Sequence, residues 1–272
     1  MTGTAGEPLV ARTLFDDHGF LESARWHAGR FWMADWKAGQ VVAFGQDGSR
    51  EIVARLKSWP MSIGFLGDGR LLILSNGDHQ VFRREHDGTL AVHATLEAHG
   101  QWNEMVVDVH DNVYVNNMMF NFHRRDERVP GYIAAVRPDG TVHRAAENVH
   151  FPNGMLLTDD GRTLVVSESN AHRLTAFDCR PDATLHSRRV WAELGDTTPD
   201  GIIVDSQGAI WVSDPELKQC VRVAEGGTVT HVIDAVDTHS CALGEHTLLM
   251  IGKGSAFTAQ VAVGSPADRH GR

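Results

Sequence analysis

Residues 200–214 read DGIIVDSQGAIWVSD, two short apolar runs on either side of a tight polar turn. Alternating apolar runs that flank a Gly-containing turn are typical of two antiparallel strands. The same pattern recurs in segments that begin at Glu22, Ser62, Asn103 and Asn153, and in a weaker sixth segment that begins at Ser240. A unit that returns every 40 to 50 residues, roughly, indicates an architecture assembled from one repeated supersecondary structure.

A second set of turn signals lies between these segments, at Asp47-Gly48, Asp87-Gly88, Asp139-Gly140, Pro181-Asp182 and Gly226-Gly227. Asp-Gly and Gly-Gly pairs between alternating runs mark hairpins, because such turns need positive φ. Each repeat therefore contains four short antiparallel strands. Six repeats of four strands predict an all-β protein, a six-bladed β-propeller. Long helices are not expected, because no apolar period of 3.6 residues persists along the chain.

The whole chain, residues 1–272, is predicted to form this single propeller domain. The N-terminal run Leu9–Phe15 is expected to pair with the last blade and to close the ring, which removes exposed strand edges. Residues 1–8 and 264–272 are expected to be flexible tails.

Charge and hydropathy exclude two classes of binding partner, nucleic acids and membranes. The net charge is −10, with acidic and basic residues interspersed, so no basic stripe offers a nucleic-acid surface. No apolar stretch is long enough to span a membrane. The N-terminus lacks the pattern of a secretory signal, and three widely spaced cysteines (Cys179, Cys220 and Cys241) are typical of reduced thiols. We expect a cytoplasmic protein with a small-molecule partner, and nothing in the sequence indicates an oligomeric state.

Oxygen-bearing side chains open four of the inner strands of the predicted propeller: Glu22, Asn103, Asn153 and Asp200. Inner strands line the central channel, so these side chains are expected to converge at one of its mouths. Carboxylate and amide oxygens suit hard divalent cations. The alternative is that Asn153-Gly154 and Asp200-Gly201 are only hairpin turns. His123 and His239 could also reach the mouth.

At these residues the sequence resembles the gluconolactonase/regucalcin family, which includes senescence marker protein and luciferin-regenerating enzymes. The resemblance rests on four spaced motifs: ESARW from Glu22, Asn103-Glu104, Pro152-Asn153-Gly154, and Pro199-Asp200-Gly201 followed by Asp205 and Gly208. It implies that Glu22, Asn153 and Asp200 bind one metal ion and that Asp200 is also the general base. Asn103 would bind substrate or a metal-bound water. The family's usual ions are Ca²⁺, Zn²⁺, Mg²⁺ and Mn²⁺, and an all-oxygen ligand set favours Ca²⁺.

The sequence departs from the sugar-lactonase pattern beside Asn103. Gln101 stands where those enzymes carry an arginine, and Glu104-Met105 replaces their Asp-Gly. The long connection over residues 116–129 is too polar for a strand, but it carries Met118, Met119, Phe120 and Phe122, which give a more apolar lid than in those enzymes. We expect Gln101, Asn103, Glu104, Phe120 and Phe122 to bind substrate. The sequence thus predicts a metal-dependent lactonase that is less specific for sugars. The alternatives are a metal-dependent aryl-ester or organophosphate hydrolase, and a non-catalytic propeller that binds calcium or a partner.

Overall fold

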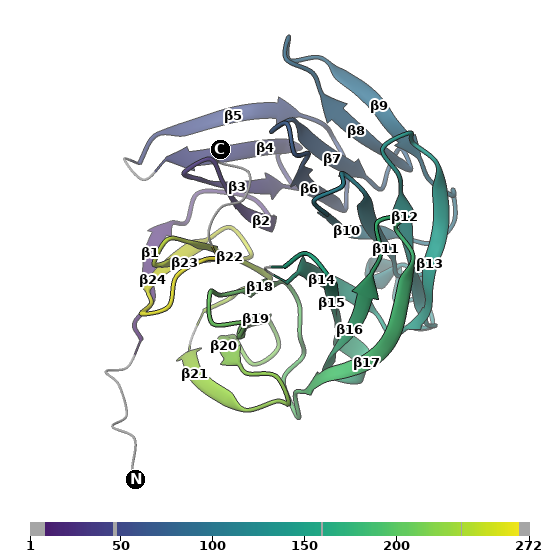
Figure 1. The fold of residues 1–272 in the computed structure, drawn as a ribbon. Coiled ribbons are helices and arrows are strands. Elements are labelled where there is room, and N and C mark those ends of the chain that lie inside the picture. The colour runs from purple at the N-terminus through teal and green to yellow at the C-terminus, as the bar shows by residue number, and fades with distance from the viewer. Residues whose placement is uncertain (1–8, 46–47, 159, 235, 267–272) are drawn as a thin grey trace.

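The computed structural model describes residues 9–45, 48–158, 160–234 and 236–266, and it confirms the predicted propeller. Six four-stranded antiparallel sheets surround one axis, with β2, β6, β10, β14, β18 and β22 innermost (Figure 1). Each of these inner strands carries one of the repeat segments. The repeat read from the sequence is therefore the first strand pair of each blade.

Blade 1 contains β2 (Leu21–His27), β3 (Arg30–Asp35), β4 (Gln40–Gly45) and β5 (Arg50–Arg55). Blade 2 contains β6 (Met61–Phe65), β7 (Leu71–Ser75), β8 (Gln80–Arg84) and β9 (Leu90–Thr95). Blade 3 contains β10 (Trp102–Val107), β11 (Val113–Asn117), β12 (Gly131–Val136) and β13 (Val142–Val149). Blade 4 contains β14 (Pro152–Leu157), β15 (Thr163–Glu168), β16 (Arg173–Cys179) and β17 (Leu185–Glu193).

Blade 5 contains β18 (Ile202–Val204), β19 (Ile210–Asp214), β20 (Gln219–Val223) and β21 (Val229–Asp234). Blade 6 contains β22 (Ser240–Gly244), β23 (Thr247–Ile251), β24 (Ala256–Gln260) and β1 (Arg12–Phe15). Strand β1 pairs with β24 in antiparallel register, Arg12 opposite Thr258. The expected closure of the ring by the N-terminal strand is confirmed.

The hydrophobic core lies between the blades. Six clusters of buried apolar side chains each combine residues of two neighbouring blades, including blades 6 and 1. Trp211, for example, is 1% exposed and packs between blades 5 and 6. A sheet that buries both faces gives near-continuous apolar strands, and the inner strand pairs show this pattern. Each blade is thus stabilised by both neighbours.

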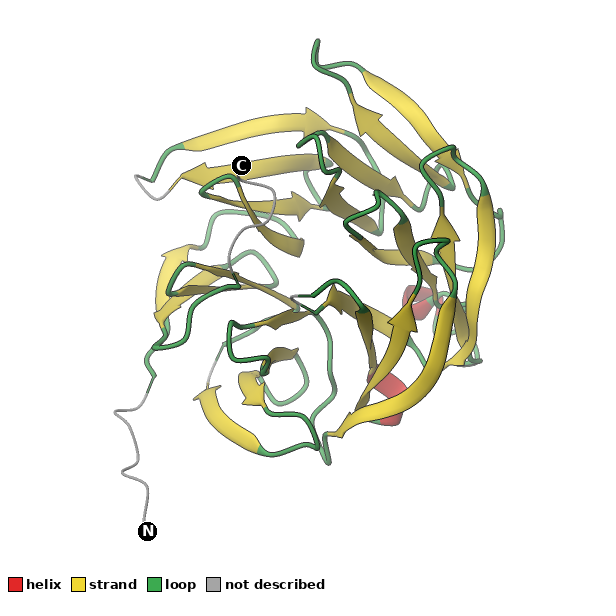
Figure 2. Cartoon of the chain, viewed as in Figure 1, coloured by secondary structure: helices red, strands yellow, loops and turns green. Residues whose placement is uncertain are grey.

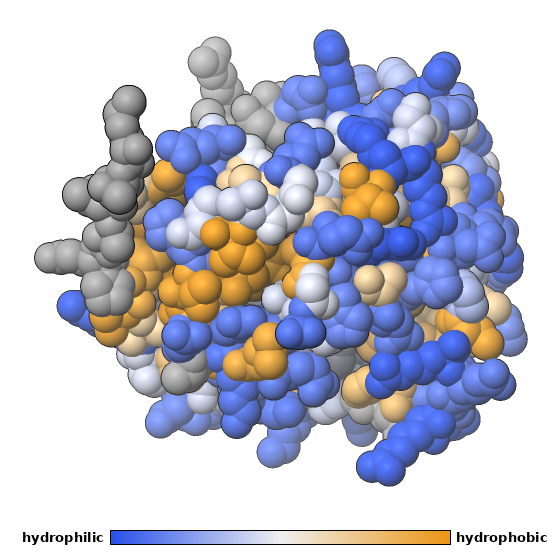
Figure 3. All heavy atoms as spheres, turned by 90° about the horizontal axis from the view of Figure 1, so that it is seen from below, coloured by the Kyte–Doolittle hydropathy of each residue, from blue (hydrophilic) through white to orange (hydrophobic). Residues whose placement is uncertain are grey.

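Burial falls from the axis to the rim. Strands β6 and β7 are buried throughout, whereas the outer strand β21 is exposed at five of its six positions. Figure 3 views this rim from below and shows mainly hydrophilic side chains, with an apolar group on its left. Two 3₁₀ helices, Phe122–Arg124 and Ser169–Ala171, are the helical elements of the described chain (Figure 2), and neither could cross a membrane.

Two boundaries differ from the expected ones. The long connection begins at Met118 rather than at residue 116, because Asn116 and Asn117 complete β11 opposite Ile133 and Tyr132. Of the expected tails, residues 1–8 and 267–272 lie outside the described residues. Residues 264–266 of the C-terminal tail are described. There the Gly264 carbonyl accepts a hydrogen bond from the Ser206 N–H (3.0 Å), and the Ser265 N–H donates to the Glu245 carbonyl (2.9 Å).

Candidate functional site

A cavity of about 790 Å³ opens at one mouth of the channel. Four of the predicted side chains from four blades line it, Glu22, Asn103, Asn153 and Asp200, together with Phe122 of the long connection. The convergence expected from the repeat is therefore present. His239, Phe20, Trp36, Phe151 and Lys253 also line this cavity.

Close backbone approach, rather than turn formation, explains the glycines that follow Asn153 and Asp200. Neither Gly154 nor Gly201 has a positive φ. A Cβ atom on Gly154 would lie 2.4 Å from the Asp200 carbonyl oxygen, and one on Gly201 would lie 2.6 Å from the Ser240 Cα. A side chain at either glycine would force the inner strands apart. The alternative that these pairs form hairpin turns is therefore wrong.

The same contacts define equivalent positions in three blades. The Gly154 N–H donates to the Asp200 carbonyl (3.2 Å), and the Gly201 N–H donates to the His239 carbonyl (2.8 Å). His239, and not Ser240, is therefore the residue of blade 6 that corresponds to Asn153 and Asp200. The inner strand of this blade begins at Ser240, as the repeat predicted, and His239 directly precedes it.

Two carboxylates and one imidazole meet at the mouth. The His239 Nδ1 lies 3.3 Å from the Asp200 Oδ2 and 3.9 Å from the Glu22 Oε1. One donor atom from each of the three residues lies within 4.8 Å of the others. The three side chains are only 11–12% exposed.

Burial changes the acidity of both carboxyl groups. It is the main reason that the pKa of Glu22 lies well above 4.5, and the neighbouring charge of Asp200 raises it further. Burial also raises the pKa of Asp200, although the hydrogen bond and charge of His239 oppose the change. Two close, buried carboxylates disfavour their shared negative charge, so the site favours a cation.

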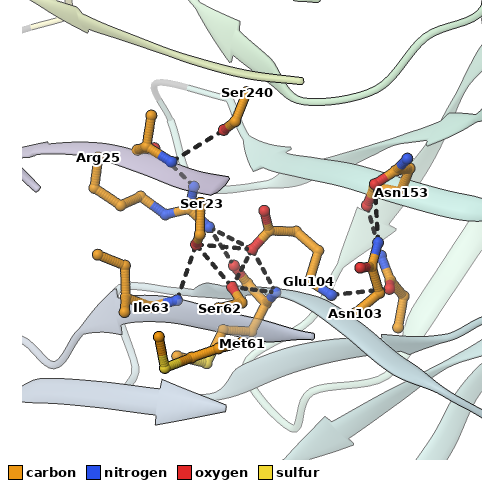
Figure 4. A network of polar contacts seen from close by, with 12 residues as sticks. Ser23, Arg25, Met61, Ser62, Ile63, Asn103, Glu104, Asn153 and Ser240 are labelled. Carbon is orange, nitrogen blue, oxygen red and sulfur yellow. Dashed lines mark hydrogen bonds and ion pairs between the residues drawn. The ribbon is translucent and has the colours of Figure 1, made fainter. Parts of the chain in front are cut away.

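The two asparagines form one unit beside the carboxylates. The Asn103 Nδ2 donates to the Asn153 Oδ1 at 2.9 Å, as Figure 4 shows. The Asn116 Nδ2 donates to the Asn153 carbonyl (2.6 Å), and the Asn153 Nδ2 donates to the Ser169 Oγ (3.4 Å). The bonds to the side-chain oxygen and nitrogen of Asn153 fix the orientation of its amide.

Three of the expected substrate-binding residues do not line the cavity. Glu104 is buried in the channel, where the Arg25 Nη2 lies 2.7 Å from its Oε1 and Ser62 donates to the same oxygen (Figure 4). Gln101 is 3% exposed, and its Oε1 accepts a hydrogen bond from the Phe122 N–H (3.3 Å). Phe120 is also buried, and its ring centroid lies 5.2 Å from that of Phe151. Gln101 and Phe120 thus contact residues that line the cavity, Phe122 and Phe151.

Aromatic rings form two sides of the cavity. Phe20 stacks on Trp36 with ring centroids 5.2 Å apart, next to His239. The rings of Phe122 and Phe151 lie 5.5 Å apart in the other group. The Arg128 guanidinium lies 5.7 Å from the Phe122 centroid and donates to the Asn170 Oδ1 (2.6 Å). The cavity lining thus combines these aromatic rings with polar side chains, among them Arg128, Asn170 and Lys253. The His123 side chain lies outside the described part.

Comparison with known proteins identifies the family of this chain and several related structures. The family described as the SMP-30/Gluconolactonase/LRE-like region matches residues 20–251. Lactonase drp35 of Staphylococcus epidermidis is 26% identical over 172 residues, which cover 58% of this chain and 51% of that protein. The chain therefore spans about half the length of this curated relative.

Two solved structures share the fold. A gluconolactonase of Xanthomonas campestris superimposes with a TM-score of 0.79 and 22% identity, over 92% of this chain and 89% of that one. A calcium-binding regucalcin of Agrobacterium tumefaciens gives a TM-score of 0.80 and 19% identity, over 95% and 96%.

The raised pKa of Glu22 predicts a pH-dependent decrease in the free energy of unfolding, to be measured with EDTA present. A carboxyl group with a raised folded pKa contributes stability below its unfolded pKa, and this contribution is lost as the pH rises toward the folded pKa. Glu22→Gln should therefore increase the free energy of unfolding at pH 7.5, and this gain should shrink at pH 4.5. Urea denaturation at both pH values measures it, with exposed Glu51→Gln as the control. An equal effect of Glu22→Gln at both pH values would contradict the prediction.

Proposed function

Because the chain belongs to the SMP-30/Gluconolactonase/LRE-like family, we propose that it is a hydrolase that opens lactones with one divalent metal ion. The observation that carries this proposal is the presence of Glu22, Asn153 and Asp200, from three blades, in one cavity. These residues lie within the part of the chain that matches the family.

The donor set fits a metal ion. Glu22 and Asp200 are buried acids, and no lysine or arginine pairs with either of them within the described ranges. Two buried carboxylates close together are costly unless enough positive charge, such as a metal ion, lies beside them. The Asn153 amide, held by Asn103, offers a neutral oxygen beside them. Glu22, Asn153 and Asp200 are thus the proposed ligands.

When bound, the ion would supply Lewis acidity that polarises the lactone carbonyl and lowers the pKa of a water molecule. Asp200 would accept a proton from the attacking water, and burial makes this carboxylate a stronger base than an exposed one. The water oxygen adds to the carbonyl carbon, the ring C–O bond breaks, and Asp200 returns the proton to the departing alkoxide. Asn103 would orient the substrate.

The aromatic part of the cavity lining favours an apolar substrate. Sugar hydroxyls against Phe122 and Phe151 would lack hydrogen-bond partners, at about 1–3 kcal/mol for each buried unpaired group. An apolar ring would instead gain about 25 cal/mol for each Å² buried. We propose that hydrophobic lactones are the preferred substrates and that Gln101 acts on specificity through its bond to the Phe122 backbone.

Metal removal tests the proposed function. Dialysis against EDTA should abolish lactone turnover and lower the melting temperature, because a ligand of the folded state alone stabilises that state. Adding Ca²⁺, Mn²⁺ or Zn²⁺ should restore both. A panel of lactones, phenyl acetate and paraoxon separates lactonase from aryl-ester and organophosphate activity. Bound metal without turnover of any substrate would support a non-catalytic propeller instead.

Asp200→Asn separates proton transfer from metal binding. The substitution keeps one side-chain oxygen but removes the base, so turnover should fall by about 10²-fold or more. Some metal binding should survive, as measured by calorimetry. Exposed Asp196→Asn is the matched control and should retain full turnover. Near wild-type turnover by Asp200→Asn would remove this residue from the base role.

Specificity is tested by kcat/KM for dihydrocoumarin, δ-decalactone and D-glucono-δ-lactone, corrected for spontaneous hydrolysis. We expect the two apolar lactones to be preferred. Phe122→Ser should lower kcat/KM for them about fivefold, the effect of losing about 1 kcal/mol of apolar contact. Val129→Ser changes an exposed residue of the same connection that does not line the cavity, and should have little effect. A preference of the wild-type protein for the sugar lactone would refute the argument.

A further inference from the structure

We propose that the His239 Nδ1 is an additional ligand of the metal ion, and that the site therefore prefers Zn²⁺ to Ca²⁺. This inference rests on the proposed metal-dependent function and changes the expected ion. The ligand set expected from the sequence contains oxygen alone, and there His239 is only a residue that could reach the mouth.

Position around the ring is the first argument. His239 receives the Gly201 N–H as Asp200 receives the Gly154 N–H. A Cβ atom on Gly201 would meet the His239 carbonyl (2.9 Å) and the Ser240 Cα, just as one on Gly154 would meet the Asp200 carbonyl and the Gly201 Cα. His239 thus continues the series of Asn153 and Asp200 into the next blade. Its side chain leaves the backbone at the point where the other proposed ligands do.

The immediate surroundings hold the imidazole toward the two carboxylates. Its Nδ1 lies 3.3 Å from Asp200 and 3.9 Å from Glu22. Donor atoms that each bind one Zn²⁺ at about 2.0–2.2 Å are separated by comparable distances. The Phe20 ring packs against the imidazole with centroids 5.0 Å apart, and Gly252 leaves room for its Cδ2 atom. The ring therefore has little freedom to turn away.

The other ring nitrogen faces a carboxylate. The His239 Nε2 is buried without a hydrogen bond and lies 3.6 Å from the Asp237 Oδ1. Histidines that bind metals usually direct their second nitrogen to a carboxylate, which fixes the tautomer and orients the ring. A small shift of Asp237 would complete this contact and leave the Nδ1 lone pair directed at the site.

The added nitrogen changes the preference for the ion. Ca²⁺ takes six to eight oxygen ligands, roughly, in flexible shells. Imidazole suits Zn²⁺, Cu²⁺ and Ni²⁺, and Zn²⁺ accepts mixed nitrogen and oxygen sets with about four ligands. The four proposed ligands supply one imidazole nitrogen, from His239, and side-chain oxygens from Glu22, Asn153 and Asp200.

His239→Gln tests the proposal, because glutamine offers an oxygen in place of the imidazole nitrogen. Calorimetry on metal-free protein gives Kd values for Zn²⁺ and Ca²⁺. We expect wild-type protein to bind Zn²⁺ more tightly, and the variant to lose at least about tenfold in Zn²⁺ affinity, since even an outer-sphere partner contributes that much. Its Ca²⁺ affinity should change less than about twofold. His172→Gln, which changes another histidine of the cavity, should leave both values unchanged.

Pulsed electron paramagnetic resonance of the Mn²⁺-loaded wild-type protein supplies a readout that does not depend on the folding of a variant. A ¹⁴N coupling from a coordinated imidazole should be present, and it should disappear in His239→Gln. Mn²⁺ binding without a ¹⁴N coupling, or an unchanged ratio of Zn²⁺ to Ca²⁺ affinity in the variant, overturns the role of His239 and leaves the metal-dependent function intact. Failure of the wild-type protein to bind any of the three ions overturns both.

Discussion

Closure of the ring by β1 and β24 is the constraint on which the rest of this structure depends. Blades bury their faces only against neighbours, so an open arc would expose one apolar face at each end. The closed seam also builds the site, because Glu22 belongs to blade 1 and His239 precedes the inner strand of blade 6. The Ala24 N–H donates to the Ser240 Oγ across the same seam, between residues 216 positions apart. The metal site proposed here can form only after the two ends of the chain have met.

Among the described residues, the carboxylates at the mouth differ from the buried acids Glu168 and Asp205, which pair with arginines. Burial alone would raise the pKa of Glu168, but hydrogen bonds and the charges of Arg173 and Arg188 outweigh it, so that this pKa lies below its ordinary value. Asp205, part of a motif that carries the family resemblance, pairs with Arg222 at 2.6 Å and is structural. Glu22, in contrast, is both buried and next to another acid. A residue whose burial lowers the stability of the fold, with no pairing side chain to offset it, is typical of a functional site.

The sequence predicted the features that repeat, and it missed those that depend on strand register. Apolar alternation and Gly-containing turns recur in every blade, so the propeller and the convergence of Glu22, Asn103, Asn153 and Asp200 could be predicted. Whether a neighbouring side chain faces the cavity depends on β-bulges, which have no clear signature in the sequence. Register shifts interrupt the first strand pair of blades 1, 3 and 4.

The register shift in blade 3 accounts for one difference between the predicted and the observed site. The bulge between Trp102 and Met105 accompanies the placement of Glu104 toward Arg25 rather than toward the cavity. The first strand pair of blade 6 has no shift, and its inner strand begins at Ser240, as the repeat predicted, directly after His239. Gln101 precedes β10, and its burial depends on a long connection whose path no periodic pattern predicts.

Main-chain bonds fix the mouth, which leaves its side chains available for chemistry. The bonds between blades 4, 5 and 6 use the backbone groups of Gly154, Asp200, Gly201 and His239. Packing demands the glycines, because a Cβ atom there would strike the next strand. It places no such demand on the side chains of Asn153 and Asp200, which precede these glycines, or on that of His239, which precedes Ser240. One blade can therefore exchange its ligand atom without disturbing the apolar contacts between blades. On this account, a change of oxygen to nitrogen in blade 6 alters the choice of ion while the propeller itself stays the same.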